Sequence, residues 1–285
     1  MHVVKSMPAA PQILSRLGHM KLDPNVDLPD VTALLKCDAA LTTRIIRVAN
    51  SPTYCVGEPY ASLEQALARV GFGEIYTIAG FAAIAQMASH DLSLYGVSGA
   101  LVRENSLLTA LIVEALAERA GVDSQEAYSA GLLRSTGKIA LEGLANASGF
   151  SGPGGKPSPS LSGRRVKYDP SSDVPLLAWE GANFGLSNCE TASFILHEWR
   201  FPASIVAAIG NHYLPLEAPE EPVLSALLNL AAGAADASGY PLPGEQSYWE
   251  VTDATWAAAG VDEGVLESAT ERALERFKSL QSTVS

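Results

Sequence analysis

Cysteines, aromatic residues and charged residues are all scarce in this chain of 285 residues. The three cysteines, Cys37, Cys55 and Cys189, are odd in number and far apart, which argues against a disulfide framework and favours a reducing cytoplasm. No neighbouring base activates Cys37 or Cys55, so both are expected to be buried structural thiols. Aromatic residues make up only 7% of the chain, and alanine and leucine dominate the apolar set. This composition favours helices over a β-sandwich or barrel, so the expected fold class is all-α.

Basic residues and long apolar runs are also few. The chain has 19 lysines and arginines against 31 acidic residues, a net charge of -12, which argues against nucleic-acid binding. No apolar stretch reaches the roughly 18 residues of a membrane span, and the N-terminus "MHVVKSMPAAPQ" lacks the apolar region of a signal peptide. The expected partners are therefore soluble proteins, and neither nucleic acid nor a membrane.

Apolar residues recur at helical spacing along most of the chain. Residues 28–50 predict two helices, the second N-capped by Asp38, and Ser62 with Gln65 predicts a capping box for the next helix. The almost entirely apolar segment 74–89 predicts a helix at the centre of a bundle. Further helical segments are expected at 100–121 with a glycine cap at Gly121, at 124–146, in four stretches between 174 and 238, and at 262–282. The segment 148–169, rich in Gly, Pro and Ser, predicts a flexible loop.

The segment "AGLLRSTGKIAL", residues 130–141, interrupts one of these helical patterns with polar residues. A phosphate-binding loop would need four residues between its glycines, a Ser or Thr after the lysine, and a preceding strand. Here five residues separate Gly131 from Gly137, Ile139 follows Lys138, and the context is helical. The phosphate-loop interpretation is excluded.

Two N-terminal motifs resemble the HDOD (HD-related output domain) family. They are "DAALTTRIIRVANSPTY", residues 38–54, with its Asn50-Ser51 helix end, and "SLEQALARVGFGEI", residues 62–75, with its Val70-Gly71 turn. The resemblance extends from about residue 8 to about residue 238. It implies a multi-helix bundle with an N-terminal helical subdomain at residues 1–95. A degenerate HD-like helical subdomain, related to HD-type metal phosphohydrolases, is expected at residues 96–285.

Catalytic HD proteins use convergent histidines and aspartates to hold metal ions that activate water. The resemblance places Asn105 at the first histidine, Arg134 and Ser135 at the His-Asp pair, and Ala232 at the last aspartate. One matching imidazole, His212, remains, and a single imidazole cannot hold a catalytic metal. No catalytic residue, metal or cofactor is therefore expected. The degenerate site comprises Asn105, Arg134, Ser135, Lys138 and His212, in which Lys138 and the adjacent Gly137 are expected to be kept for backbone and packing reasons.

The leading functional hypothesis is a non-catalytic signal-transduction output or scaffold module of bacterial regulatory type, acting through protein contacts. It would be a free-standing protein or the output half of a response regulator, and the resemblance suggests a receiver domain or a cyclic-dinucleotide enzyme as partner. Arg44 and Arg47 lie three residues apart and share one helix face. That face is a candidate partner surface, with an ordinary solvated face as the alternative.

Two other functions are open at this point. The chain could be a metal-dependent phosphohydrolase of HD type acting on a nucleotide or cyclic dinucleotide, with ligands rearranged from Glu180, Glu190, His197 or Asp236. Alternatively, Arg134 could bind an anionic small ligand, since guanidinium groups suit phosphates and carboxylates. A structural ion pair between Arg134 and a carboxylate of the bundle is favoured over that ligand site.

Overall fold

The computed structural model describes residues 10–22, 27–51, 54–55, 57–149, 166–218 and 222–284. Within these ranges the chain is helical or irregular, and the one pairing of extended backbone is the isolated bridge between Leu92 and Val97. The all-α fold class is confirmed. Most of the predicted flexible loop at 148–169 lies outside the described residues, which resume at residue 166.

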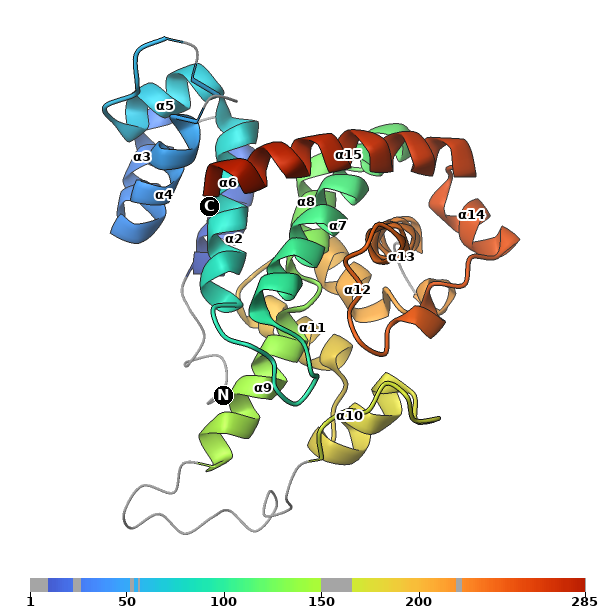
Figure 1. Cartoon of the computed structure of the whole chain (residues 1–285). Helices are drawn as coiled ribbons and strands as arrows, with labels where there is room; N and C mark the ends of the chain where they lie inside the picture. The colour runs from blue at the N-terminus through green and yellow to red at the C-terminus, as the bar shows by residue number, and fades with distance from the viewer. Residues whose placement is uncertain are drawn as a thin grey trace.

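The N-terminal part forms a small lobe and two longer helices that join it to the rest (Figure 1). Its elements are α2 (Ala10–Leu22), α3 (Leu28–Lys36), α4 (Ala39–Ala49), α5 (Leu63–Val70) and α6 (Phe72–Met87). Helices α3, α4 and α5 pack on one another as the lobe, while α2 packs against α6. The two helices expected between residues 28 and 50 are therefore present.

Short polar side chains start these helices as predicted. Asp38 caps α4 by accepting a hydrogen bond from the Leu41 amide at 2.9 Å. Ser62 caps α5 by accepting from the Gln65 amide, but the Gln65 side chain accepts from the Ala61 amide instead of that of Ser62. The predicted capping box is therefore only half formed, with its return bond displaced by one residue.

The C-terminal part is a bundle built around one long helix, α7 (Gly99–Ala120), against which α8, α13 and α15 pack (Figure 1). Gly121 ends α7 in the left-handed conformation, as predicted. The remaining elements are α8 (Ser124–Leu133), α9 (Thr136–Gly149), α10 (Leu176–Phe184), α11 (Asn188–Glu198), α12 (Ala203–Asn211), η1 (Pro215–Glu217), α13 (Pro222–Ala237), η2 (Gln246–Tyr248), α14 (Asp253–Ala259) and α15 (Glu263–Val284).

The helical segment expected at 124–146 consists of two helices, because the chain turns at Arg134 and Ser135, at the start of the polar run in that segment. The break separates α8, which packs on α7, from α9, which packs on α11. One straight helix could not make both contacts. The break also places Arg134 and Ser135 in the interior, where each is 1% exposed.

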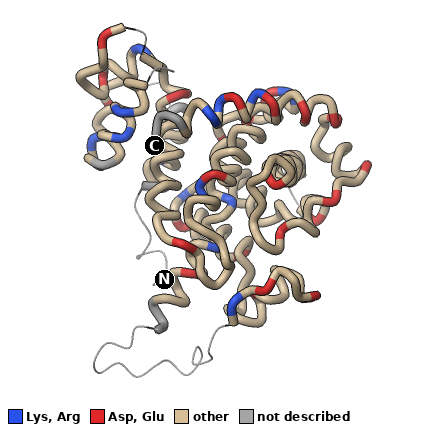
Figure 2. Tube along the Cα trace, in the orientation of Figure 1, with Lys and Arg blue, Asp and Glu red and all other residues tan. Residues whose placement is uncertain are grey.

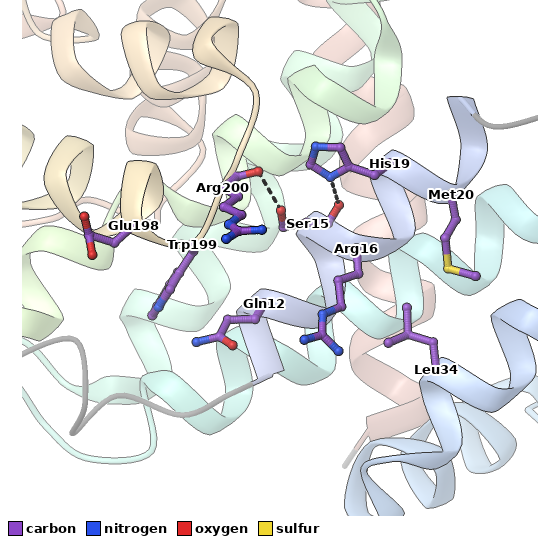
Figure 3. Close-up of a pocket in the computed structure, with 9 residues that line it drawn as sticks. All are labelled: Gln12, Ser15, Arg16, His19, Met20, Leu34, Glu198, Trp199 and Arg200. Atoms are coloured by element: carbon purple, nitrogen blue, oxygen red, sulfur yellow. Dashed lines mark hydrogen bonds between the residues drawn. The ribbon is translucent and has the colours of Figure 1, made fainter.

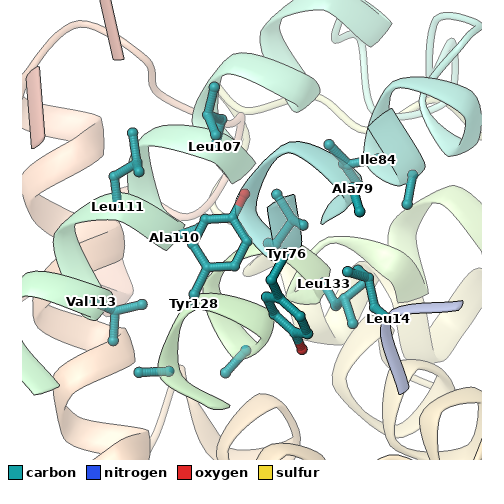
Figure 4. Close-up of a cluster of buried hydrophobic side chains, with 14 of the residues drawn as sticks. Leu14, Tyr76, Ala79, Ile84, Leu107, Ala110, Leu111, Val113, Tyr128 and Leu133 are labelled. Carbon is teal, nitrogen blue, oxygen red and sulfur yellow. The ribbon is translucent and has the colours of Figure 1, made fainter. Parts of the chain in front are cut away.

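The main hydrophobic core runs across residue 95 without interruption. It includes Leu14 of α2, Ile84 of α6 and Phe277 of α15. Figure 4 shows Leu14 and Ile84 together with Leu111 of α7 and Leu133 of α8. Helix α6 is buried along most of its length, which confirms that it is a central helix. The N-terminal and C-terminal parts therefore share this core, and it extends across the predicted subdomain boundary at residue 95.

Hydrogen bonds and ion pairs reinforce this shared core. The Tyr76 hydroxyl of α6 lies 2.6 Å from the Ser129 hydroxyl of α8. Arg276 of α15 forms ion pairs with Glu74 of α6 at 2.8 Å and with Glu114 of α7 at 2.6 Å. These contacts bring α6, α7, α8 and α15 together into one unit. No helix in the described part of the chain is long and apolar enough to cross a membrane.

The three cysteines are all free, but only Cys189 is buried. Cys37 is exposed and Cys55 is half-buried, so the expectation that both are buried thiols is wrong. Cys37 caps the C-terminus of α3, and Cys55 lies in the loop before α5. Both positions lie at the surface of the small lobe, because the apolar faces of α3 and α4 point away from them into the core.

Candidate functional site

Three of the five degenerate-site positions meet around one buried carboxylate, Glu245. Arg134, at the break between α8 and α9, places Nη1 3.1 Å and 3.0 Å from the two carboxylate oxygens of Glu245. Lys138 of α9 forms a second ion pair with Glu245, and Asn105 of α7 accepts a hydrogen bond from Nη2 of Arg134. All four side chains are at most 3% exposed. Arg134 therefore holds a carboxylate of the bundle, which is the favoured of the two interpretations of this residue.

Glu245 lies in the segment between α13 and η2 and also accepts a hydrogen bond from the Tyr213 hydroxyl at 2.7 Å. Burial by itself would raise the pKa of Glu245, but Arg134 and Lys138 outweigh it and hold that pKa at about 2. The carboxylate is therefore ionised at neutral pH. Two buried cations therefore pair with the same buried carboxylate.

Aromatic rings enclose the two cations. Lys138 Nζ lies 5.9 Å from the ring centre of Tyr95 and 6.0 Å from that of Tyr213. The Arg134 guanidinium lies 5.6 Å from the ring centre of Trp249. Cation–π attraction at these separations partly compensates for the hydration energy that the two cations lose on burial. The rings also seal the ion pairs away from solvent, since Tyr95 and Tyr213 are buried.

His212, the fourth degenerate-site position, is fully buried at the C-terminal end of α12. Burial and the nearby Arg134 lower the pKa of His212 to about 3, so its imidazole is neutral. Nδ1 lies 2.7 Å from the Ile209 carbonyl, which assigns the ring proton to Nδ1 and leaves the lone pair on Nε2. The Cys189 thiol lies 3.7 Å from Nδ1, and burial raises the pKa of that thiol, so this pair contains no thiolate.

The other two positions singled out from the sequence are buried but form no part of the ion-pair network. The Ser135 hydroxyl has no hydrogen-bond partner in the described ranges. Ala232 of α13 is fully buried. The α13 side chain that reaches this region is Asn229, which donates to the carbonyls of His212 at 2.8 Å and Tyr248 at 3.0 Å.

The four residues considered as rearranged metal ligands have other, separate roles. Glu180 is buried and accepts from the Tyr95 hydroxyl and from Asn188. Glu190 forms the capping box of α11, His197 is exposed on that helix, and Asp236 bonds Gln246. In the part of the chain that the structure describes, no three His, Cys, Asp or Glu side chains are grouped to hold a metal ion. The donors around Glu245 do not suit a divalent cation either, because two cations already neutralise its carboxylate.

Sequence reasoning missed the acidic centre of this network. Glu245 lies in the loop "PLPGEQSYW", about 110 residues after Arg134, and nothing in that loop's composition marks it as a partner. Tyr213 directly follows His212, so its proximity could have been inferred. Asn229 could have been noted as a polar residue within the apolar run of α13.

Comparison with known families and solved structures shows which proteins share this fold. The HDOD domain model matches residues 7–148. The chain belongs to the HDOD family. The match includes α2 to α9, and therefore Asn105, Arg134 and Lys138, whereas His212 and Glu245 lie beyond it. No curated protein matches the chain.

Solved structures of low sequence identity share the fold along almost the whole chain. An HDOD domain protein of unknown function from Geobacter sulfurreducens is 19% identical, with a TM-score of 0.71 over 98% of this chain and 93% of that one. A protein provisionally named as a signal transduction protein, from Marinobacter aquaeolei, is 20% identical, with a TM-score of 0.68 over 97% of this chain and 58% of that one. A protein provisionally named as a phosphohydrolase, from Shewanella amazonensis, is 19% identical, with a TM-score of 0.60 over 98% and 94%.

Proposed function

We propose that this chain is a non-catalytic signal-transduction module that acts through contacts with other proteins. The observation that carries the proposal is the buried ion pair of Arg134, which stands where the HD resemblance expects a metal-binding histidine. Lys138, one turn further on, pairs with the same carboxylate. Both cations are buried and are neutralised by Glu245. The degenerate site then serves to hold α7, α8, α9 and the loop before η2 in one arrangement.

A metal-dependent phosphohydrolase would need a different set of side chains at this place. Like charges repel strongly where water is excluded, so a divalent ion beside Arg134 and Lys138 would be opposed by both. One neutral imidazole, that of His212, faces the region, and catalytic metal centres use three or more protein ligands. The enzymatic alternative therefore requires that Arg134 and Lys138 leave the site.

The names of similar proteins include both a signalling role and a phosphohydrolase, and the side chains at the site support the signalling role. The Marinobacter protein provisionally named for signal transduction is longer than this chain, which covers 58% of it. A module within a longer protein is consistent with the output half of a response regulator. Because the Shewanella protein is provisionally named a phosphohydrolase, that activity is the second candidate function.

Elemental analysis of the purified chain, together with a phosphodiesterase assay, tests the proposal. We expect substoichiometric iron, manganese and zinc, and no hydrolysis of bis-p-nitrophenyl phosphate above the blank with added manganese. The cause is the pair of cations at the degenerate site. An active HD phosphodiesterase assayed in parallel serves as the control. Stoichiometric metal with turnover would contradict the proposal and make the phosphohydrolase the leading function.

We propose the exposed face of α4 that carries Arg44 and Arg47 as the contact surface for an acidic protein partner, such as a receiver domain. Both residues are exposed, and no ion pair of the described residues involves either of them. Figure 2 shows both basic and acidic residues on the lobe of α3, α4 and α5, and Arg44 and Arg47 share one face of α4 there. Charge complementarity of this kind governs association rate and specificity.

Charge reversal at this face should abolish the contact. Crosslinking in the source cells with the double variant Arg44→Glu, Arg47→Glu is expected to lose the protein partners that the unmodified chain captures. The matched control is Lys278→Glu, an exposed lysine on α15, which should retain them. Capture of the same proteins by the double variant would place the contact surface elsewhere.

A further inference from the structure

A pocket of about 750 Å³ lies between the N-terminal helix α2 and the connection from α11 to α12. Gln12, Ser15 and Arg16 line it from α2, and Glu198, Trp199 and Arg200 line it from the other side (Figure 3). Its size is within the range of small-molecule sites, and junctions between parts of a fold are frequent places for them. The pocket is separate from the Glu245 network, with which it shares no lining residue.

Two unpaired guanidinium groups give the pocket its charge. Arg16 and Arg200 are exposed, and the ion pairs among the described residues involve neither of them. In Figure 3 both side chains lie beside the same space, together with the amide of Gln12. Planar guanidinium groups match the oxygens of phosphate. One carboxylate, that of Glu198, lines the pocket as well, and it can accept hydrogen bonds from hydroxyl groups but not from a phosphate dianion.

The backbone at Arg200 is unusual for a residue with a side chain. Arg200 has a φ of 60°, and it is the one non-glycine residue with positive φ within the described ranges. Its amide donates to the His197 carbonyl at 2.9 Å, and the Phe201 amide donates to the Leu196 carbonyl at 3.0 Å. These two bonds form the helix-ending motif in which glycine is the usual left-handed residue. An arginine here has a backbone conformation that glycine would adopt without strain, and such strain is concentrated at functional sites.

One hydrogen bond holds Arg200 in place, and one buried donor beside it has no partner in the described part of the chain. The Ser15 hydroxyl donates to the Arg200 carbonyl at 2.9 Å, which fixes the strained residue against α2. Trp199, beside it, is 5% exposed, and its indole nitrogen has no hydrogen-bond acceptor in the described part of the chain. A buried N–H group normally has a partner, and an oxygen of a bound molecule would provide one.

We infer that this pocket binds a phosphorylated sugar, either a sugar phosphate or a nucleotide. Arg16 and Arg200 bind the phosphate, Glu198 and Gln12 bind the sugar hydroxyls, and the Trp199 indole donates to a ligand oxygen. The inference does not depend on whether the chain is catalytic, because the pocket and the Glu245 network share no residue. A ligand bound here would contact both α2 and the end of α11.

Thermal unfolding and calorimetry of the full chain test this site with inorganic phosphate, ribose 5-phosphate, AMP and uncharged ribose as probes. We expect ribose 5-phosphate or AMP to raise the melting temperature in a saturable way and to bind in a 1:1 ratio. Inorganic phosphate should bind more weakly, and ribose should have no effect. No response to either phosphorylated sugar, or an affinity no greater than that for inorganic phosphate, would overturn the inference.

Arg200→Gly separates binding from folding. Glycine relieves the backbone strain, so we expect this variant to melt at a higher temperature than the unmodified chain while its response to the phosphorylated sugar is lost. Arg16→Gln should weaken binding by about tenfold or more, because one charge-assisted hydrogen bond is removed. Trp199→Phe should also weaken it. Unchanged affinity in both arginine variants would show that the ligand binds elsewhere and would overturn the assignment.

Discussion

Replacing Glu245 by glutamine is expected to lower the free energy of unfolding by about 3–5 kcal/mol, the usual cost of leaving buried charges unpaired. Glutamine is of similar size, so the change removes charge with little change in packing. Arg134 and Lys138, 1% and 3% exposed on their side chains, would then lose the carboxylate with which both form ion pairs. Chemical denaturation with urea or guanidinium, followed by circular dichroism, measures this difference.

The pH dependence of this stability difference provides a second test, because it depends on the ionisation of Glu245. The pKa of Glu245 is about 2 in the folded chain, below the value of about 4.3 for an unfolded glutamate. A lowered folded pKa means that the ion pair contributes fully to stability above the unfolded pKa, and that this contribution disappears as pH falls from about 4.5 to about 2. The difference between the unmodified chain and Glu245→Gln should therefore shrink over that range.

The control for this prediction is an exposed ion pair. Glu64→Gln breaks the pair between Glu64 and Lys36, whose side chains are 47% and 53% exposed, and should leave stability unchanged within error. If Glu245→Gln were as harmless as Glu64→Gln, the network around Glu245 would not hold the site together, and the argument against a metal there would fail as well.

Replacing Gly137 by alanine should be the most damaging small change in α9. A Cβ at this position would lie 1.8 Å from the backbone oxygen of Asn188, so α9 and α11 would have to move apart. Asn188 cannot easily yield, because its amide and its side chain both donate to the buried Glu180. We expect a loss of about 3 kcal/mol, at the upper end of the usual cost of overpacking.

Gly143 provides the matched control on the same helix. A Cβ there meets no atom within 4 Å, and the residue is exposed. Gly143→Ala should therefore stabilise the chain by about 0.5–1 kcal/mol, since alanine favours the helix over glycine. The two variants, compared by denaturant unfolding, separate close helix packing from helix propensity. Equal effects would mean that the α9–α11 contact is looser than the structure shows.

Local sequence patterns were sufficient to predict most helices and several of their ends. The period of apolar residues located α3, α4, α6, α7, α10, α11, α12, α13 and α15, and the caps at Asp38 and Gly121 depend only on neighbouring residues. Helix α14 was missed, since seven residues are too few to show a clear period. The polar run from Arg134 to Lys138 marked the place of the break between α8 and α9, but the sequence did not show that α8 packs on α7 while α9 packs on α11.

The same division applies to function. The sequence by itself determined the all-α class and the resemblance to HDOD proteins, and it predicted the replacement of HD ligands at Asn105, Arg134 and Ser135. Each of these rests on residue identity or on spacing within one segment. Only the tertiary structure decided that Glu245 neutralises Arg134 and Lys138, and that Arg16 and Arg200 face one pocket. Those contacts join residues more than 100 positions apart, and local spacing carries no information about which distant side chains packing will bring together.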